Sequence, residues 1–424
     1  MERNIKIGIL TFHKSINTGA FIQCYSLITR LMKDFPDEKI EVIDYCTKKT
    51  KERYSYHLLE YVFSACKTLK YSEDRRSSIR KMGGRIKGLI LNPRLLRDRK
   101  KEYKLFKEVW GGGRRFLSDE SLITDDMNRF FETYKNKYDI VIVGSDCVWQ
   151  YEAYPFPNVY FLNEKLSPIK MSYAACASNF RFDRLTSSDK KIVMDSLKAF
   201  QYIGVRDIQS EGFMDALSTK LDYEHNCDPA FLLEVDKVPV DRNLVRKKLE
   251  DAGVDFSKKI VGIQLRCEAL GEKIADCLDL GSDYQYVIIR KRNSISNIFI
   301  DTLNPLEWSI VFGFFDVIIT DFFHAAIMSV KNNVAPLAFD TDFNHFDRNQ
   351  TRICDLMTRL NLRDFYYQVQ EDLQIDCVWL KSGFERIINE VNMPNFRQLV
   401  CNESRHYEGF RDKLQRVIKE LKQE

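Results

Sequence analysis

Residues 5–45, IKIGILTFHKSINTGAFIQCYSLITRLMKDFPDEKIEVIDY, decide the fold. The first seven are mostly apolar and β-branched, which is typical of a buried strand. After a polar loop that ends at Gly19, apolar residues recur at steps of three and four up to Phe35, and this spacing predicts a helix. Residues 39–45 predict a second strand. A strand, a loop, a helix and a strand in this order predict the start of a doubly wound parallel sheet.

The same alternation recurs along the chain and predicts two domains. Further strands are predicted over 138–143, 169–174, 202–205, 259–265, 285–289, 316–320 and 335–339, and helices over 305–314, 323–330 and 404–421. A chain of 424 residues is also too long for one ordinary core. We therefore expect an α/β protein of two Rossmann-like domains that face a cleft. We place the N-terminal domain at 1–235, the C-terminal domain at 240–395 and a C-terminal helix at 396–424, for which packing back on the N-terminal domain is one expected arrangement.

Composition and charge restrict the class of protein. Hydrophobic residues make up 44% and charged residues 30% of the chain, which is ordinary globular composition. The formal net charge of +4 does not indicate a nucleic-acid partner. No run of about 18 apolar residues is present, and the first six residues lack the apolar core of a signal peptide. We expect a cytoplasmic protein without a membrane span.

The eleven cysteines are scattered along the chain. No two of them are spaced as C-x-x-C, so the sequence indicates neither a zinc site nor a redox pair, and no metal is expected. Their odd number and their apolar surroundings favour free thiols in a reducing compartment.

Residues 48–115 differ from the rest and predict a basic helical insertion on the first domain. Between Lys67 and Arg115 there are 17 lysines and arginines against 5 acidic residues, so the remainder of the chain is acidic on balance. A charge run of this kind is usually a solvated helix face. The alternative is docking on an anionic membrane surface or on a pyrophosphate-linked acceptor, because apolar residues interleave with the charges at Leu89, Ile90, Leu91, Leu95 and Leu96.

Two loops that follow strands in the first domain carry candidate binding residues. In parallel sheets such loops gather at one edge and line a cleft. Asn17 and Gly19 begin a predicted helix, where free N–H groups favour an anion or a hydroxyl, although Asn17 also suits a plain helix cap. In residues 144–149, GSDCVW, the glycine permits a sharp turn that places Ser145, Asp146 and Trp149 at the sheet edge. A carboxylate beside an aromatic platform suits a sugar, and the alternative is an Asx turn with a packed tryptophan.

Two further loops supply a cation and a titratable group. Arg206 follows the strand at 202–205, and its planar guanidinium suits a carboxylate or a phosphate, unless it forms a salt bridge with Asp207. His324 follows the strand at 316–320 and opens a helix, with Asp321 and Phe323 beside it; a structural role is its alternative. The chain has no P-loop, no G-x-G-x-x-G after its first strand and no G-x-S-x-G, so a dinucleotide site is not expected.

Taken in order, these loops resemble a known family. The order is NTGAFIQCYSL, YDIVIVGSDCVWQ, KMSYAACAS, GVRD, DPAFLL and DVIITDFFHA. It resembles the polysaccharide pyruvyl transferase family, whose members show N-Y-G-A-x-L-Q, G-S-D-Q-x-W, S-Y-A-A-S, S-V-R-E, D-P-x-x-L-L and T-D-S-F-H-G at such positions. The resemblance extends from Ile5 to about Asp340. The chain departs from the pattern at Thr18, Cys147, Phe322 and Ala325, which replace Tyr, Gln, Ser and Gly.

The resemblance implies a glycosyltransferase-B-like architecture and a transferase reaction. A pyruvyl group would pass from phosphoenolpyruvate to hydroxyls of a saccharide acceptor, giving a pyruvate ketal and phosphate in the biosynthesis of a surface polysaccharide. Phosphoenolpyruvate is then a donor substrate, and no separate cofactor is implied. The implied catalytic residues are His324 as the general acid, Arg206 as the partner of the donor's anionic groups, and Asp146. The implied substrate-binding residues are Asn17, Gly19, Ser145, Trp149, Asp321 and Phe323.

Two other functions remain open at this point. A glycosyltransferase of the same architecture would use a nucleotide sugar and would need an acidic residue in the second domain to hold the ribose. A non-catalytic sugar-binding relative would keep the fold without activity, but such a protein should have lost Arg206 and His324, and both are present. A lipid-linked acceptor and peripheral contact with the inner face of an anionic membrane are further expectations.

Overall fold

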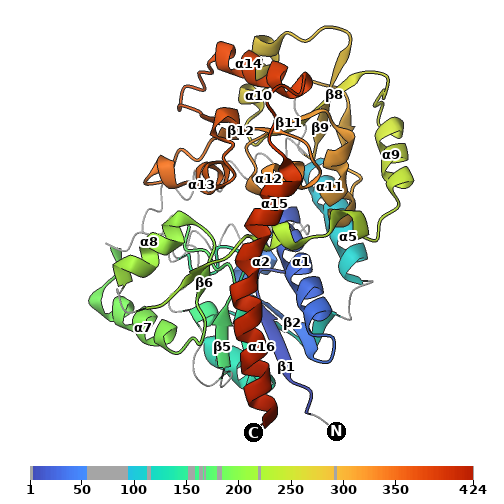
Figure 1. Ribbon diagram of the computed structural model, residues 1–424. Coiled ribbons are helices and arrows are strands. Elements are labelled where there is room, and N and C mark those ends of the chain that lie inside the picture. The colour runs from blue at the N-terminus through green and yellow to red at the C-terminus, as the bar shows by residue number, and fades with distance from the viewer. Residues whose placement is uncertain are drawn as a thin grey trace, which may run out of the picture.

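The computed structural model describes residues 3–54, 94–111, 116–150, 158–161, 166, 169–178, 184–217, 221–290 and 294–423. These residues form two lobes, each built on a parallel sheet with helices around it (Figure 1). Most strands and helices predicted from the sequence are present, with their ends shifted by a few residues. The strands at 117–123, 224–225, 299–300 and 366–368 were not predicted from the sequence.

The first sheet has five parallel strands in the order β3-β2-β1-β4-β5. Their bounds are β1 Lys6–Leu10, β2 Lys39–Cys46, β3 Leu117–Ile123, β4 Ile140–Val143 and β5 Ile169–Ser172. Two short strands, β6 Gly204–Val205 and β7 Glu224–His225, pair with each other in parallel. They continue the sheet beyond β5 through isolated bridges, one of which joins Ala175 to Val205.

The second sheet has six parallel strands in the order β10-β9-β8-β11-β12-β13. Their bounds are β8 Lys259–Gln264, β9 Tyr284–Ile289, β10 Phe299–Ile300, β11 Val317–Thr320, β12 Pro336–Asp340 and β13 Tyr366–Gln368. In both sheets the first strand of the domain lies in the middle and the chain then moves outward in both directions, which is the doubly wound arrangement.

Helices cover both sheets in Figure 1. Their bounds are α1 Thr18–Asp34, α2 Lys48–Arg53, α5 Arg94–Gly111, α6 Met127–Tyr134, α7 Ser187–Lys198, α8 Ile208–Leu217, α9 Arg242–Asp251, α10 Glu268–Leu278, α11 Pro305–Val311, α12 Phe323–Lys331, α13 Arg352–Arg359, α14 Cys377–Ile388, α15 Phe396–Ser404 and α16 Glu408–Gln423. None of the helices in the described part of the chain is long and apolar enough to cross a membrane.

The central strands explain where a ligand can bind. All four residues of β4 and four of the five in β1 are buried, because helices cover both faces of a parallel sheet. The strand order reverses between β1 and β4 in the first sheet and between β8 and β11 in the second. Loops diverge at such reversals and leave a crevice at the carboxyl ends of the strands. The four loops after β1, β4, β8 and β11 are therefore the places to look for a site.

The terminal helix α16 extends from the C-terminal domain, at the top of Figure 1, and lies along the N-terminal domain below it. Its Phe410 ring packs on Tyr173 and Tyr202, with centroid distances of 4.8 and 5.3 Å. Near its end, Lys422 Nζ lies 2.6 Å from Glu38 Oε1. The last segment of the chain thus closes over the first sheet, beside β5 and β6.

A partly buried histidine, His225, connects β7 to α15. His225 Nδ1 lies 2.7 Å from Glu211 Oε1, and its Nε2 lies 3.9 Å from Glu403 Oε1. Burial disfavours the charged imidazole, but hydrogen bonding to these two carboxylates outweighs it and raises the pKa of His225 to about 9.

The basic insertion is described only in part. The structure describes α2 and α5, while residues 55–93, which include Leu89, Ile90 and Leu91, lie outside the described part, as do the side chains of Leu95 and Leu96. Helix α5 reaches the second domain, because Glu102 accepts a hydrogen bond from Arg290 at 2.9 Å. It also packs on the first domain through Phe106, whose ring centroid lies 6.1 Å from that of Phe21. The part of the insertion in α5 therefore joins the two domains.

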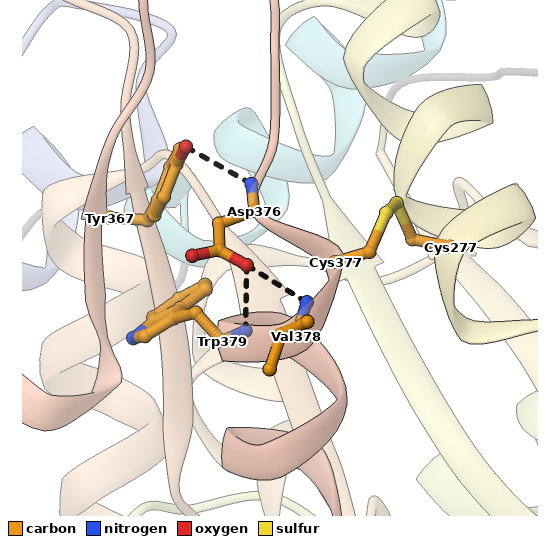
Figure 2. Close-up of a disulfide and its surroundings, with 6 residues drawn as sticks. All are labelled: Cys277, Tyr367, Asp376, Cys377, Val378 and Trp379. Carbon is orange, nitrogen blue, oxygen red and sulfur yellow. Dashed lines mark hydrogen bonds between the residues drawn. A yellow bond between two sulfur atoms is a disulfide. The ribbon is translucent and has the colours of Figure 1, made fainter.

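One pair of cysteines corrects the interpretation of the cysteines as free thiols. Cys277 in α10 and Cys377 at the start of α14 form a disulfide across a sequence separation of 100 residues (Figure 2). Asp376 caps α14 by accepting hydrogen bonds from the backbone of Val378 and Trp379, which fixes the helix end that carries Cys377. The packing of α10 on α14 brings the two sulfurs together. The disulfide could not be predicted from the spacing of cysteines in the sequence. The other cysteines described are free thiols.

Candidate active site

A cavity of about 360 Å³ lies between the two domains, at the carboxyl ends of both sheets. The loop after β1 contributes Asn17 and Gly19, and the loop after β4 contributes Asp146. From the second domain come Arg266 after β8, Arg290 after β9, Phe322, Phe323 and His324 after β11, and Arg352 at the start of α13. The prediction that loops after strands of both domains meet at one cleft holds for these residues.

His324 crosses the cleft and packs on the start of α1. A methyl group on Gly19 would lie 2.1 Å from His324 Nδ1, so the imidazole occupies the space that any side chain at position 19 would need. On its other side, His324 Nε2 lies 2.5 Å from the side-chain amide nitrogen of Gln23 and 3.7 Å from Asp228 Oδ2. The His324 side chain is 14% exposed. It is thus held in a fixed orientation and still faces the cavity.

Asp228 connects the polar groups behind the histidine. Its Oδ2 accepts hydrogen bonds from Arg206 Nη1 at 2.7 Å and from Gln23 Nε2 at 2.8 Å, and its Oδ1 accepts one from the backbone of Ala230. Burial would raise the pKa of this carboxyl, but contact with His324 and the charges of His324 and Arg206 outweigh it and lower the pKa to about 2. Asp228 begins the DPAFLL motif, but the sequence alone does not assign it to the site.

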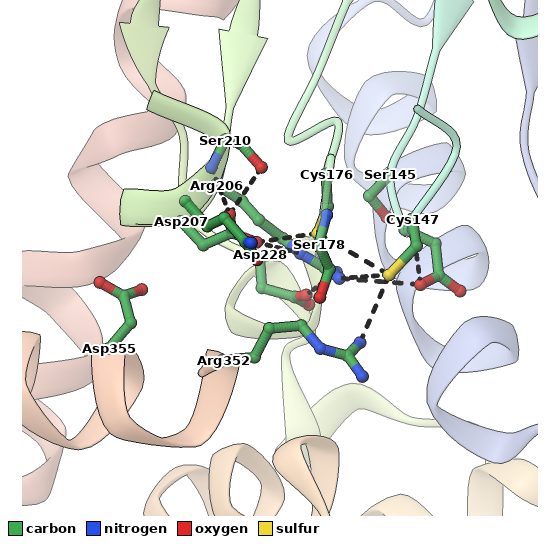
Figure 3. A network of polar contacts seen from close by, with 12 residues as sticks. Ser145, Cys147, Cys176, Ser178, Arg206, Asp207, Ser210, Asp228, Arg352 and Asp355 are labelled. Atoms are coloured by element: carbon green, nitrogen blue, oxygen red, sulfur yellow. Dashed lines mark hydrogen bonds and ion pairs between the residues drawn. The ribbon is translucent and has the colours of Figure 1, made fainter. Parts of the chain in front are cut away.

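Arg206 lies beneath the cavity and does not line it. Its side chain is 1% exposed, with Asp228 at 2.7 Å and with Asp146 and Asp207 each at 3.7 Å (Figure 3). Arg206 therefore forms the salt bridge that was the alternative to ligand binding, with Asp228 as its main partner. A role of Arg206 in binding the donor stays a prediction.

Two arginines that the sequence did not single out present guanidinium groups to the cavity. Arg352 stacks over Phe323 at 5.8 Å from the ring centroid, and Arg266 stacks over Phe322 at 4.5 Å. Arg266 Nη1 donates to the backbone carbonyl of Asp321 at 2.7 Å, which fixes its direction. Planar guanidinium groups held over aromatic rings suit carboxylate and phosphate ligands.

The turn after β4 has the backbone that its sequence predicts. Gly144 has φ +114°, and a methyl group there would lie 2.3 Å from the carbonyl oxygen of Tyr173. Asp146 adopts a left-handed conformation with φ +79°, and its Oδ1 accepts a hydrogen bond from the backbone of Cys147 at 2.9 Å. This hydrogen bond comes from the next residue and not from the one two positions on, so it does not form an Asx turn, and Asp146 lines the cavity.

A second cavity, of about 470 Å³, adjoins the first, and the two share Ile16. It lies at the carboxyl ends of β1, β2 and β3, and its lining includes Trp110 of α5, Lys14 and Lys51. Asp44 at its floor lies 2.8 Å from both His13 Nε2 and Lys14 Nζ. Although burial favours the neutral acid, hydrogen bonds from these two groups hold the pKa of Asp44 well below its usual range.

Comparison with known proteins supports what the geometry indicates. The profile described as "Polysaccharide pyruvyl transferase" matches residues 17–342, more than half of the chain. The chain belongs to the polysaccharide pyruvyl transferase family. No curated protein matches it significantly.

Solved structures with a similar fold are distant in sequence. UDP-GlcNAc 2-epimerase from Neisseria meningitidis is 9% identical, with 97% of this chain and 99% of that chain covered and a TM-score of 0.52. The enzyme from Methanocaldococcus jannaschii is 13% identical, with 96% and 99% covered and a TM-score of 0.50. At such identities the likeness shows the fold alone. The predicted fold class, two Rossmann-like domains in a glycosyltransferase-B-like arrangement, is confirmed.

In this member of the polysaccharide pyruvyl transferase family, two predicted binding residues take structural positions. Trp149 is fully buried, and its indole N–H donates to the carbonyl of Tyr160 at 3.2 Å, so the prediction of an aromatic platform for sugar is wrong. Asp321 is also fully buried and accepts hydrogen bonds from the backbone of Arg266 and from the Thr341 hydroxyl. It holds the loop that carries Arg266 and is not exposed to a substrate.

The other predicted residues lie at or beside the cavity. Asn17, Gly19, Asp146 and Phe323 line it together with His324. Asn17 Oδ1 accepts hydrogen bonds from the backbone of Gly19 at 2.9 Å and of Ala20 at 3.3 Å, so Asn17 is the cap of α1 as well.

Ser145 is buried behind the cavity and acts on it through Gln23. Its hydroxyl donates to Gln23 Oε1 at 3.0 Å, and the amide nitrogen of the same Gln23 contacts both His324 and Asp228. Ser145 thus contributes to the orientation of the Gln23 amide.

The four departures from the family pattern also take defined positions. Phe322 and Ala325 line the cavity beside His324, and Cys147 contacts Arg352 there. Thr18, in the first turn of α1, also lines the cavity. All four changes thus lie at the cavity or contact an arginine that lines it.

Proposed function

We propose that this transferase moves a pyruvyl group from phosphoenolpyruvate to two hydroxyls of a saccharide, forming a pyruvate ketal. The observation that carries the proposal is the position of His324. Its imidazole is fixed between Gly19, Gln23 and Asp228, and it faces a cavity whose lining includes Arg266, Arg290 and Arg352. A titratable group beside cations is the combination that a dianionic donor requires for proton transfer.

Arg352 and Arg266 are the proposed partners of the donor's carboxylate and phosphate. Both stack on aromatic rings, which fixes the planes of their guanidinium groups for bidentate contact. Arg206 contributes positive charge from below, through its network with Asp146 and Asp228. Bringing an anion into this cavity thus offsets the repulsion between neighbouring cations.

In the proposed reaction His324 donates a proton to C3 of the donor, whose methylene becomes a methyl group. C2 becomes electrophilic, and a sugar hydroxyl attacks it. Phosphate leaves, and a second hydroxyl closes the ketal, so two O–H bonds of the acceptor are replaced by two C–O bonds. Asp228 keeps the imidazole in the direction of the cavity from 3.7 Å away. A positioned acid of this kind contributes about 10²–10⁴-fold to a rate.

The second cavity is the proposed acceptor side. The indole nitrogen of Trp110 has no hydrogen-bond partner among the described residues, and an aromatic ring offers a stacking surface for a sugar. Lys14 and Lys51 would suit a phosphate, which a lipid-linked acceptor carries next to its sugar. Because both cavities share Ile16, an acceptor there could present hydroxyls to a donor beside His324.

The nucleotide-sugar alternative has less support. The carboxylates that line the first cavity in the described part of the chain are Glu102 and Asp146. Both belong to the N-terminal half, and Glu102 already pairs with Arg290. A nucleotide-sugar enzyme of this architecture would instead hold its ribose with an acidic residue of the second domain.

The test compares the two donors on the full chain. We expect phosphoenolpyruvate to raise the melting temperature and a nucleotide sugar to leave it unchanged, since only a ligand that binds the native state stabilises it. Phosphate should then be released from phosphoenolpyruvate only with a saccharide acceptor, whose mass should rise by one pyruvate less one water. Stabilisation by the nucleotide sugar alone would contradict the proposal and favour the glycosyltransferase.

A further inference from the structure

Two thiols meet below the cleft, at the ends of β4 and β5 (Figure 3). The sulfurs of Cys147 and Cys176 are 3.7 Å apart. The backbone beside them is already paired: the N–H of Cys176 donates to the carbonyl of Asp146 at 3.0 Å, and the N–H of Trp149 donates to the carbonyl of Cys176 at 3.2 Å. Because the two segments are held side by side, a small rotation of the side chains would bring the sulfurs to bonding distance.

The two thiols have different surroundings. Cys147 is partly exposed, with Arg352 Nη1 at 3.6 Å and Arg206 Nη2 at 3.9 Å from its sulfur. Cys176 is fully buried, and its thiol donates to Asp207 Oδ2 at 2.9 Å. One sulfur thus faces two cations, and the other faces a carboxylate.

This difference separates the acidities of the pair. Contact with Cys176 and the positive charges of Arg352 and Arg206 lower the pKa of Cys147, against burial and the nearby carboxylate of Asp146. Burial first, and then the neighbouring Cys147 and Asp207, raise the pKa of Cys176 well above its usual range. Cys147 is therefore the more acidic thiol of the pair, and Cys176 is the less acidic one.

We propose that Cys147 and Cys176 form a peroxide-sensitive dithiol at the floor of the cleft, with Cys147 as the attacking thiol and Cys176 as the resolving thiol. The sulfur of Cys147 attacks a peroxide oxygen, the O–O bond breaks, and the other oxygen leaves as water after it takes up a proton. Cys147 becomes a sulfenic acid. The sulfur of Cys176 then displaces hydroxide from it, and its own proton completes a second water. Two thiols and one peroxide thus give one disulfide and two waters, and the two sulfurs together lose two electrons.

Oxidation would change the surface that faces the substrate. In the reduced state the Cys147 sulfur accepts a hydrogen bond from Arg352, which lines the cavity. In the disulfide the sulfur is drawn toward Cys176, so its contact with Arg352 changes. Because the oxidation concerns the two thiols alone, it can be tested whatever reaction the cleft performs.

The experiment treats the full chain with hydrogen peroxide and maps the peptides without reduction. We expect a linked Cys147–Cys176 peptide that a dithiol reductant removes. In Cys176→Ser, dimedone should label Cys147 as the sulfenic acid, and in Cys147→Ser no linked peptide should form. The exposed Cys401 is the internal comparison thiol. Oxidation that appears only at Cys401, or labelling of Cys147 that never proceeds to the linked peptide in the unmutated chain, would overturn the proposal.

A second measurement tests whether Arg352 activates the Cys147 thiol or whether the thiol reacts only because reagents can reach it. Alkylation of Cys147 by iodoacetamide at pH 7 should slow about tenfold in Arg352→Gln, since removal of a neighbouring cation raises a thiol pKa by roughly one unit and lowers the thiolate fraction accordingly. Arg405→Gln removes an exposed arginine directly after the end of α15 and should leave the rate unchanged. An equal rate in Arg352→Gln and in the unmutated chain would show that the cation does not activate the thiol.

Discussion

Replacement of Gly19 by alanine tests the contact on which the site depends. The added methyl group would lie 2.1 Å from Nδ1 and 2.5 Å from Cγ of His324, far inside van der Waals contact. The obstacle is a side chain, so the ring can be displaced while α1 stays in place. We therefore expect Gly19→Ala to move the imidazole out of line with the cavity without altering its chemistry.

The effect of Gly19→Ala on the free energy of unfolding is the sum of two opposing terms. Alanine is favoured over glycine in a helix by about 0.5–1 kcal/mol, whereas overpacking a filled site costs about 1–3 kcal/mol. Gly212 in α8 provides the matched control, because nothing lies within 4 Å of a methyl group there. Gly212→Ala should show the favourable helix term alone. The helix term is common to both variants, so their free energies of unfolding should differ by about 1–3 kcal/mol.

Urea unfolding measures the free energy of unfolding of each variant. Acceptor-dependent phosphate release measures its turnover. Turnover should fall about 10²–10⁴-fold in Gly19→Ala, because a displaced acid contributes nothing, and should be unchanged in Gly212→Ala. Stabilisation by phosphoenolpyruvate should survive in both, since Arg352 and Arg266 do not touch Gly19. If Gly19→Ala were as stable and as active as Gly212→Ala, the packing of His324 on α1 would be refuted. A destabilised but fully active variant would refute the role of His324 as the acid.

Further predictions concern single groups. His324→Ala should lose about 10²–10⁴-fold in turnover with its unfolding curve intact, and near-normal turnover would end its assignment as the acid. Arg206→Lys keeps the charge but loses the planar fork, so the KM for the donor should rise; an unchanged KM would leave Arg206 as a structural ion pair with Asp228. Because the pKa of His225 is raised from 6.5 to about 9, its stabilising effect is complete below pH 6.5 and is lost as pH rises through 9. That loss should be on the order of 3 kcal/mol, and it should be absent in urea titrations of His225→Gln. If residues 67–115 dock on anionic lipid, the chain should co-sediment with anionic liposomes at low salt and be released at high salt; no binding at low salt, or binding that ignores salt, would remove this idea.

The site residues that could be predicted from the sequence are those in loops directly after strands, because the ends of strands can be located from apolar runs. The apolar run before Asn17 and the one before His324 locate two strand ends, and the doubly wound order brings both loops to the same edge. Arg352 could not be found in this way, because it begins α13 and is not attached to a strand end that faces the cavity. The position of Arg352 depends on how α13 packs against the second sheet. This packing cannot be predicted from short-range spacing in the sequence. The Cys277–Cys377 disulfide has the same character.

The carboxylates show why a motif alone cannot assign roles. Asp146 and Asp321 follow short apolar strands, Asp228 follows the polar segment EHNC, and all three stand in motifs shared with the family. In the structure Asp146 lines the cavity, Asp228 joins Arg206 to the side of His324, and Asp321 holds the loop of Arg266. The difference lies in what each meets from another segment, because a buried carboxylate keeps its charge only where cations or N–H groups converge on it. Asp228 meets two such groups from opposite domains, so the ionised state of Asp228 depends on the two domains standing in the arrangement that forms the cleft.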